Sequence, residues 1–200
     1  MKKTSVRNYL IEEGLQLKSG EILISPNIAY ETWGNLNKDF SNAVLVTTGL
    51  SPSSHIASNE LNIEQGWWEN IIGPNKAIDT NRFFVICANS LGSCFGSTGP
   101  SSKNPQTNQP YQLLFPRLSI EDIASSLISL VKHLGINQLQ TIVGPSMGGM
   151  TALSIVQQAP EITKEMILIS TSASSRPFSI ALRSLQRKMI TSDPAWKNGN

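Results

Sequence analysis

Histidine and cysteine are both scarce in this chain, which has two of each in 200 residues. Cys87 and Cys94 are too few for a disulfide framework and lack the spacing of a metal site, so we expect no bound metal. Long apolar runs are also missing. No segment approaches the roughly 20 residues that a membrane-spanning helix requires, and no apolar stretch follows the basic start of the chain as it would in a signal peptide. We therefore expect a cytoplasmic protein that is not attached to a membrane.

The sequence also lacks an excess of charge of either sign. Its 16 Lys and Arg against 14 Asp and Glu give a formal net charge of +2 at pH 7, and both signs are scattered along the chain. Nucleic-acid binding needs a basic patch or stripe, so we expect small-molecule substrates and no nucleic acid. A hydrophobic content of 40% is ordinary for a globular protein, and 200 residues are enough for one domain with a sizeable core.

What the chain does have is an alternation of apolar strand-like runs with helical patterns. Ser119 begins the first helical pattern with Asp122 in an imperfect capping box, and Gly135 ends it. The alternation predicts an α/β fold, with a mostly parallel sheet and helices on both faces, in a single domain over residues 1–200. Strands are expected at residues 21–33, 43–47, 83–87, 139–143 and 166–169, and helices at 119–135, 150–158 and 179–190.

Residues 144–149, Gly-Pro-Ser-Met-Gly-Gly, lie between an expected strand and an expected helix. Gly-x-Ser-x-Gly on a strand-to-helix turn is the nucleophile elbow of α/β-hydrolase enzymes. The turn is so tight that only small residues fit two places before and after the serine. It lifts the hydroxyl clear of the sheet and points the next helix's N-terminus at any oxyanion formed there. Ser146 is therefore the expected nucleophile. The alternative is a glycine-rich turn that only lets helix and strand pack closely.

The partners of such a serine are missing from their usual place. In this fold an acid and a histidine follow the nucleophile, and no histidine follows Ser146. His133 lies near the end of a helical pattern, off its apolar stripe, and is expected to be a solvated helix-end residue. His55 either lines the site or, as we favour, is a polar loop residue. The pair Trp67-Trp68 is interpreted as a packing anchor rather than a ligand platform.

An oxyanion hole needs the backbone N–H of the residue after the nucleophile and a second N–H from the loop after an earlier strand. Met147 supplies the first. The second is expected from the loop 48–51, Thr-Gly-Leu-Ser, which directly follows the strand 43–47. An ordinary turn is the alternative for this loop.

Several segments together make the chain resemble the homoserine O-acetyltransferase family. This is the α/β-hydrolase-fold group of amino-acid O-acyltransferases that also includes homoserine and serine O-succinyltransferases. The most specific part is residues 89–102, which contain Gly-Ser-Thr-Gly-Pro within a polar stretch that is long for a loop. The similarity runs from about residue 22 to the end, and further matches lie at residues 66–69, 72–74, 78–80, 144–150, 186–190 and 193–196.

The resemblance implies a ping-pong reaction with an acyl-CoA as co-substrate and no bound cofactor. Ser146 would take the acyl group and pass it to the side-chain hydroxyl of L-homoserine, in methionine biosynthesis. Leu50 takes the position of the second oxyanion donor beside Met147. Arg187 matches a substrate-side arginine at the entrance of the site, with a surface helix arginine as the alternative. The family's site lies under a helical lid that excludes water. We expect this lid to begin near residues 175–200 and a homodimer to form through it.

The chain departs from the family in its loops and in its length. A His-Ala-Leu-Thr-Gly-like stretch is replaced by residues 48–52, Thr-Gly-Leu-Ser-Pro, and the second elbow residue is Pro145. Family members continue past the equivalent of Asn200 into the lid, the triad aspartate and the triad histidine. We therefore expect an N-terminal portion of an acyltransferase. It should be inactive by itself because Ser146 has no general base, and it should aggregate through an uncovered sheet edge.

Other functions stay open beside homoserine acetylation. Residues 49–55 and 177–180 look closer to the serine O-succinyltransferase branch, so the donor is acetyl-CoA or succinyl-CoA. Serine and homoserine differ by one methylene, which is worth only about 1–3 kcal/mol of discrimination in a pocket. A plain esterase on the same elbow is a second alternative, and an inactive truncated remnant is a third.

Overall fold

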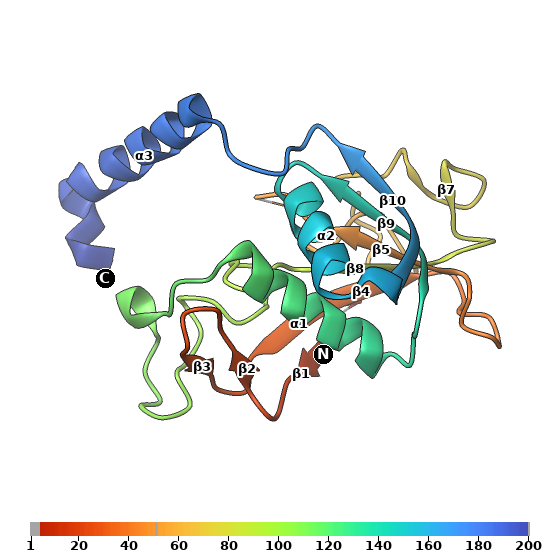
Figure 1. Cartoon of the computed structure of the whole chain (residues 1–200), viewed down its shortest axis with the longest axis horizontal. Helices are drawn as coiled ribbons and strands as arrows, with labels where there is room; N and C mark the ends of the chain where they lie inside the picture. The colour runs from red at the N-terminus through yellow and green to blue at the C-terminus, as the bar shows by residue number, and fades with distance from the viewer. Residues whose placement is uncertain (1–4, 51, 200) are drawn as a thin grey trace.

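One six-stranded sheet organises the computed structural model, which describes residues 5–50 and 52–199 (Figure 1). The strand order is β1-β4-β8-β5-β9-β10. The pairings β8–β5, β5–β9 and β9–β10 are parallel, whereas β1–β4 and β4–β8 are antiparallel. The predicted mostly parallel α/β sheet is confirmed. The strands are β1 (Arg7–Leu10), β4 (Asn27–Trp33), β8 (Phe84–Ala88), β5 (Ala43–Thr47), β9 (Leu139–Pro145) and β10 (Thr163–Ile169).

Two helices cover one face of this sheet. They are α1 (Ile120–His133) and α2 (Met147–Gln158), which pack against each other in front of the strands (Figure 1). All five residues of β5 are buried, as expected of a central parallel strand. Leu45 points towards the helices, while its neighbours Val44 and Val46 point to the opposite face, because side chains alternate along a strand.

The opposite face is covered differently from the expectation of helices on both sides. Residues 52–80 pack there, and their regular structure consists of β6 (Ile72–Gly73) and β7 (Ile78–Asp79). Ile56 and Ile72 are fully buried against this face, and Trp67 and Trp68 pack beside them with their rings tilted by 37°. The tryptophan pair is therefore a packing anchor, as predicted.

The capping box at the start of α1 is complete, although aspartate replaces the usual glutamate. The Ser119 hydroxyl accepts the Asp122 N–H at 3.2 Å, and the Asp122 carboxylate accepts the Ser119 N–H at 2.7 Å. The same carboxylate also accepts the backbone N–H of Lys18 at 2.7 Å. Asp122 thus caps the helix and joins it to the N-terminal hairpin of β2 (Leu15–Gln16) and β3 (Ile22–Leu23).

The single strand expected over 21–33 is in fact two strands. The chain breaks between β3 and β4, where Ser25 has φ 41° and Pro26 follows. A positive φ interrupts the extended backbone, and proline has no N–H for a ladder hydrogen bond. Hydrophobicity alone does not reveal this break. The short 3₁₀ helices are η1 (Gln112–Leu114), η2 (Pro160–Ile162) and η3 (Pro194–Gly199).

The last long helix, α3 (Pro177–Ser192), stands apart from the sheet (Figure 1). A connection over residues 170–176 joins it to β10, and every residue of the helix is exposed. Its exposed apolar side chains are Phe178, Ile180, Leu182, Leu185, Met189 and Ile190. Among the described residues, no helix has both the length and the apolar character needed to cross a bilayer.

Candidate active site

Ser146 lies between β9 and α2 with a strained backbone. Its φ of 54° and ψ of −122° fall outside the regions allowed for a residue with a Cβ. The conformation is held by two backbone hydrogen bonds, one from the Ser146 N–H to the Ile169 carbonyl at 2.9 Å and one from the Gly149 N–H to the Ser146 carbonyl at 3.0 Å. The residue is exposed. Strain of this kind persists where the surroundings over-determine it, which is common at reactive positions.

The glycines of the elbow are required by close backbone approach. A Cβ on Gly144 would lie 2.7 Å from the Gly149 Cα, and one on Gly148 would lie 2.3 Å from the Thr47 carbonyl oxygen. Both distances are well below the van der Waals contact distance, so a side chain at either position would overlap the backbone. The Thr47 hydroxyl also donates to the Gly148 carbonyl at 2.8 Å. The elbow is therefore clamped onto the end of β5, as the small-residue pattern predicted.

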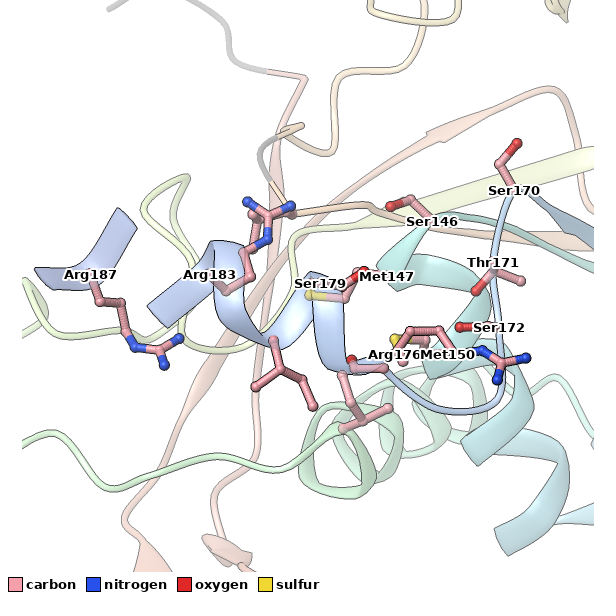
Figure 2. Close-up of a pocket in the computed structure, with 14 residues that line it drawn as sticks. Ser146, Met147, Met150, Ser170, Thr171, Ser172, Arg176, Ser179, Arg183 and Arg187 are labelled. Carbon is pink, nitrogen blue, oxygen red and sulfur yellow. The ribbon is translucent and has the colours of Figure 1, made fainter. Parts of the chain in front are cut away.

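A cavity of about 680 Å³ opens beside Ser146 (Figure 2). One wall comes from the elbow and the start of α2, through Met147 and Met150. A second comes from residues 170–172 after β10, and a third from Arg176 and the side of α3 that faces the elbow. Such a volume lies within the range of small-molecule sites.

The two residues expected to form the oxyanion hole border this same cavity. Met147 is the first residue of α2, so its N–H has no i−4 partner inside the helix. Leu50 belongs to the loop after β5, lines the same cavity and is 59% exposed. Ser51, the last residue of that expected loop, lies outside the described residues. Met147 and Leu50 thus line the same cavity as Ser146, and their role as the two oxyanion donors stays a prediction.

Buried polar contacts fix the loop that carries Leu50. The hydroxyls of Thr48 and Ser90 lie 3.0 Å apart, and the Asn89 side chain accepts the Ser54 N–H at 2.6 Å. Thr48, Ser54 and Asn89 are each at most 2% exposed. The loop after β5 is thereby attached to the loop after β8, which limits how far Leu50 can move relative to Ser146.

The Gly-Ser-Thr-Gly-Pro segment, residues 96–100, lies outside the cavity lining and braces β4. The Ser97 hydroxyl accepts the Ala29 N–H at 3.0 Å and donates to the Asn89 carbonyl at 2.8 Å. The Thr98 hydroxyl accepts the Asn27 N–H at 2.8 Å. The most specific stretch of the sequence therefore supports the loops that carry the site.

Neither histidine reaches Ser146. His133 is exposed at the far end of α1 and stacks on Tyr9 with ring centroids 4.2 Å apart, in line with the expected helix-end position. His55 belongs to the face covered by residues 52–80. Its Nδ1 lies 3.1 Å from a carboxylate oxygen of Glu31, and its Nε2 lies 2.8 Å from the Glu64 carbonyl oxygen. Both ring nitrogens of His55 are thus engaged away from the cavity.

The Glu31–His55 pair is a buried structural contact. Glu31 is 1% exposed. Burial by itself lowers the pKa of His55, but the Glu64 carbonyl and the Glu31 carboxylate outweigh it, and the net pKa is raised. The imidazole therefore joins residues 52–80 to β4 through its contacts with Glu31 and Glu64.

Arg187 lines the cavity, and its contact with substrate stays a prediction. Two further arginines that the sequence did not reveal also line the cavity. These are Arg176 and Arg183 (Figure 2). A signal was available for Arg183, because it lies four residues before Arg187 in α3 and residues four apart share one face of a helix. Arg176 precedes the helix, so this spacing does not place it. Within the described residues, no three His, Cys, Asp or Glu side chains cluster as a metal site.

The fold and the elbow define the class of this protein. The chain belongs to the α/β-hydrolase family, because the family model described as alpha/beta hydrolase fold matches residues 42–200. More particularly, the chain is 54% identical over 194 residues to the serine O-succinyltransferase of Stenotrophomonas maltophilia (strain K279a). That alignment covers 97% of this chain and 52% of the relative. The chain thus spans about half the length of the curated relatives it matches.

Two solved structures with similar folds carry different names. The homoserine O-acetyltransferase from Bacillus anthracis has a TM-score of 0.92 at 33% identity, covering 100% of this chain and 56% of that one. Esterase E22 has a TM-score of 0.88 at 34% identity, covering 97% and 55%. The predicted resemblance to amino-acid O-acyltransferases is confirmed by these relatives. Their names support the succinyltransferase branch, which the sequence analysis gave as the alternative, more than homoserine acetylation, which it gave as the main expectation.

Proposed function

We propose that these residues form part of an acyl-CoA-dependent O-acyltransferase. The enzyme transfers a succinyl group to the side-chain hydroxyl of L-serine, and L-homoserine is the alternative acceptor. The observation that carries the proposal is the strained, exposed Ser146 at one wall of a cavity that the start of α2 and Leu50 also line. The names of relatives at 54% and 53% identity favour succinyl and serine over acetyl and homoserine.

The chemistry proposed for these residues runs in two halves. The Ser146 hydroxyl attacks the thioester carbonyl of succinyl-CoA, and the N–H groups of Met147 and Leu50 stabilise the oxyanion that forms. The C–S bond then breaks and CoA leaves as the thiol. The hydroxyl of the amino acid attacks the acyl-serine, and Ser146 is regenerated with the ester product.

The proposal includes two further roles, one for α3 and one for Arg187. The helix α3 forms the start of a lid over Ser146, which its place on the cavity wall supports. Arg187 contacts substrate from that lid. An acceptor that competes with water needs such cover, because an open acyl-enzyme hydrolyses.

The test uses the longest natural polypeptide that contains residues 1–200, read from the gene across codon 200. With succinyl-CoA we expect CoA release that depends on added L-serine, and Ser146→Ala should lower kcat by about three orders of magnitude or more. Release that survives in Ser146→Ala would refute the nucleophile. A reading frame without a later Asp and His would support the inactive remnant.

An esterase is the second candidate, favoured by the likeness to esterase E22. The two activities differ in how much of the acyl group is transferred from the acyl-enzyme to the amino acid and how much to water. If the acyl group goes to water at the same rate with and without serine, the esterase replaces the transferase.

The 200-residue polypeptide itself should show no acyl transfer. Both of its histidines are engaged or distant from Ser146, so the serine has no general base. Losing a triad member costs several orders of magnitude in rate. Robust thiol release by the purified polypeptide from either thioester would contradict this prediction.

A further inference from the structure

Thr48 lies between the nucleophile elbow and the loop that follows β8. Its backbone contacts the elbow, because a Cβ on Gly148 would lie 2.9 Å from the Thr48 carbonyl oxygen. Its hydroxyl contacts the end of β8 and the loop after it, at 3.4 Å from the Ala88 carbonyl oxygen and 3.0 Å from the Ser90 hydroxyl. Thr48 therefore joins the element that carries the nucleophile to the neighbouring loop.

The pair of hydroxyls is shielded from solvent. Thr48 is 2% exposed and Ser90 is 7% exposed. A buried hydroxyl that loses its partner keeps the desolvation cost of an unpaired polar group, so the pair resists separation. Because β5 and β8 are neighbouring parallel strands, the pair links the two loops where these strands end.

The position of Leu50 depends on such anchors. Within residues 5–50 and 52–199 its own N–H makes no hydrogen bond. The loop is anchored on both sides of it, by Thr48 two residues earlier and by Ser54 four residues later, whose N–H donates to the Asn89 side chain at 2.6 Å. A free N–H on a loop held at both ends suits an oxyanion donor, since a preorganised donor needs no rearrangement during the reaction.

We propose that Thr48 and Ser90 are positioning residues that hold the Leu50 N–H in place for the oxyanion formed at Ser146. The inference rests on the proposed function and adds to it the contact that maintains the oxyanion hole. Ser90 belongs to residues 89–102, the most specific stretch of the sequence, which lies outside the cavity lining. Since neither hydroxyl lines the cavity, loosening the pair lowers the rate of oxyanion formation and leaves substrate binding unchanged.

Both halves of the proposed reaction pass through this oxyanion hole. In the first half the Ser146 hydroxyl attacks the carbonyl of succinyl-CoA, and the C–S bond breaks as the thiol leaves. In the second half the hydroxyl of L-serine attacks the same carbonyl, and its bond to the Ser146 oxygen breaks. The carbonyl oxygen thus becomes an oxyanion at the same place twice. A residue that positions the donor affects both rate constants, whereas a residue that binds one substrate affects one.

The experiment measures the two half-reactions separately in the full natural chain. Excess enzyme mixed with succinyl-CoA gives the acylation rate from thiol release. Added L-serine then gives the rate at which acyl-Ser146 disappears, followed by intact-protein mass spectrometry. Thr48→Val keeps a similar shape and removes the hydroxyl. We expect it to lower both rate constants about ten- to a hundred-fold, with the half-saturating concentrations of both substrates unchanged.

Further variants assign the effect to the pair. Ser90→Ala should lower both rate constants by a similar factor. The double variant should be no slower than either single one, because the second change removes a contact already lost. Thr48→Ser should restore most of the rate, since it keeps the hydroxyl. Urea unfolding checks that each variant is folded. If Thr48→Val unfolds, Ser90→Ala carries the test, because alanine introduces no new atom.

Ser129→Ala is the matched control. The Ser129 hydroxyl lies 2.7 Å from the Tyr9 hydroxyl and joins α1 to β1, and neither residue lines the cavity. This variant also separates a pair of hydroxyls, but it should leave both rate constants unchanged.

The outcomes separate this inference from the proposed function. A change confined to one half-reaction or to the half-saturating concentrations would mean that the loop contacts a substrate. Additive effects of the two single variants would mean that the hydroxyls act independently. Either result refutes the inference while the function stands. If the acyl group passes only to water, the esterase replaces the transferase, and the inference then requires acylation and hydrolysis to slow together. If the wild-type chain releases no thiol, the proposed function falls and takes the inference with it.

Discussion

At the residue scale, Ser146 shows how a local pattern encodes a reactive group. Its φ and ψ are unfavourable for any non-glycine residue, and a Cβ on Gly144 or Gly148 would lie only 2.7 Å or 2.3 Å from the nearest backbone atom. The strain is maintained by one hydrogen bond to β10 and one from α2, and by the contact of Thr47 in β5 with Gly148. The reactive geometry therefore depends on the packed sheet as well as on the motif.

Gly148→Ala should lower the free energy of unfolding by about 1–3 kcal/mol, the usual cost of overpacking. The added Cβ would lie 2.3 Å from the Thr47 carbonyl oxygen, which belongs to a buried strand that cannot yield easily. Urea unfolding measures the change. Gly49→Ala is the control, because its Cβ would meet Pro52 at an ordinary 3.7 Å. Equal unfolding midpoints for the two variants would contradict the close-packing argument.

His55 should make stability fall as pH rises. Its pKa is raised in the folded protein, so the protonated form is favoured by folding. The stabilisation is fully present below the unfolded pKa of about 6.5 and is lost as pH rises through the folded value. Unfolding midpoints at pH 6 and pH 8.5 should therefore differ in the wild type.

The difference should shrink in His55→Gln, which cannot be protonated. His133→Gln is the matched control, because His133 is exposed and stacks on Tyr9 without an ion pair among the described residues. A pH dependence that survives in His55→Gln but disappears in His133→Gln would assign the effect to His133 and contradict the prediction.

At the scale of elements, the segment 52–80, which covers the second face of the sheet in place of a helix, is held together by hydrogen bonds to Glu69. The Glu69 carboxylate accepts the Ser58 N–H at 2.7 Å, the Gly66 N–H at 3.1 Å and the Ser58 hydroxyl at 3.0 Å, and Lys76 donates to it at 3.2 Å. The Ser58 backbone bond contributes most to lowering the pKa of Glu69 to about 2. One carboxylate thus joins three parts of the segment 52–80, at Ser58, Gly66 and Lys76.

Glu69→Ala should cost about 1.5–3 kcal/mol, the range for hydrogen bonds to a charged group. The wild type should also lose stability as pH falls from about 4.5 towards 2, because a carboxylate with a lowered pKa stabilises only while ionised. The variant should lack that contribution. Chemical unfolding at pH 7 and pH 3 measures both effects. Glu60→Ala, at an exposed position, should change stability by less than about 0.5 kcal/mol and controls for the loss of a negative charge.

At the scale of the whole molecule, two apolar surfaces have no cover among the described residues. One is β10, the edge strand, where Ile167, Leu168 and Ile169 are 51%, 37% and 40% exposed. The other is the apolar side of α3, on which Phe178 and Met189 are 75% and 66% exposed. An exposed edge with apolar side chains is a template for pairing with another chain.

The 200-residue polypeptide should therefore self-associate at micromolar concentration. Ile167→Lys should reduce association, because lysine on an edge strand opposes strand pairing. Ile63→Lys is the control, since Ile63 is 86% exposed but lies away from the edge. Sedimentation velocity measures the effect. A discrete dimer lost in Met189→Lys would instead support the homodimer expected through the lid. A monodisperse monomer that melts cooperatively would contradict the prediction.

The sequence by itself determined the features that depend on neighbours along the chain. Residue periodicity located the central strands and α1 to α3, and Gly-x-Ser-x-Gly between a strand and a helix located Ser146. The Gly-Ser-Thr-Gly-Pro segment pointed to the amino-acid O-acyltransferases, in agreement with the relatives that match. These signals are local, because they reflect the helical and strand repeats and the close packing of one turn.

The tertiary structure decided which distant residues meet. It placed Leu50 and the arginines of α3 around the same cavity as Ser146, and it paired His55 with Glu31 instead of the serine. It also divided the strand expected over residues 21–33 and covered the second face with a segment of little regular structure. Such contacts join residues that are tens of positions apart, and their free energy depends on burial and charge in the folded chain rather than on local sequence.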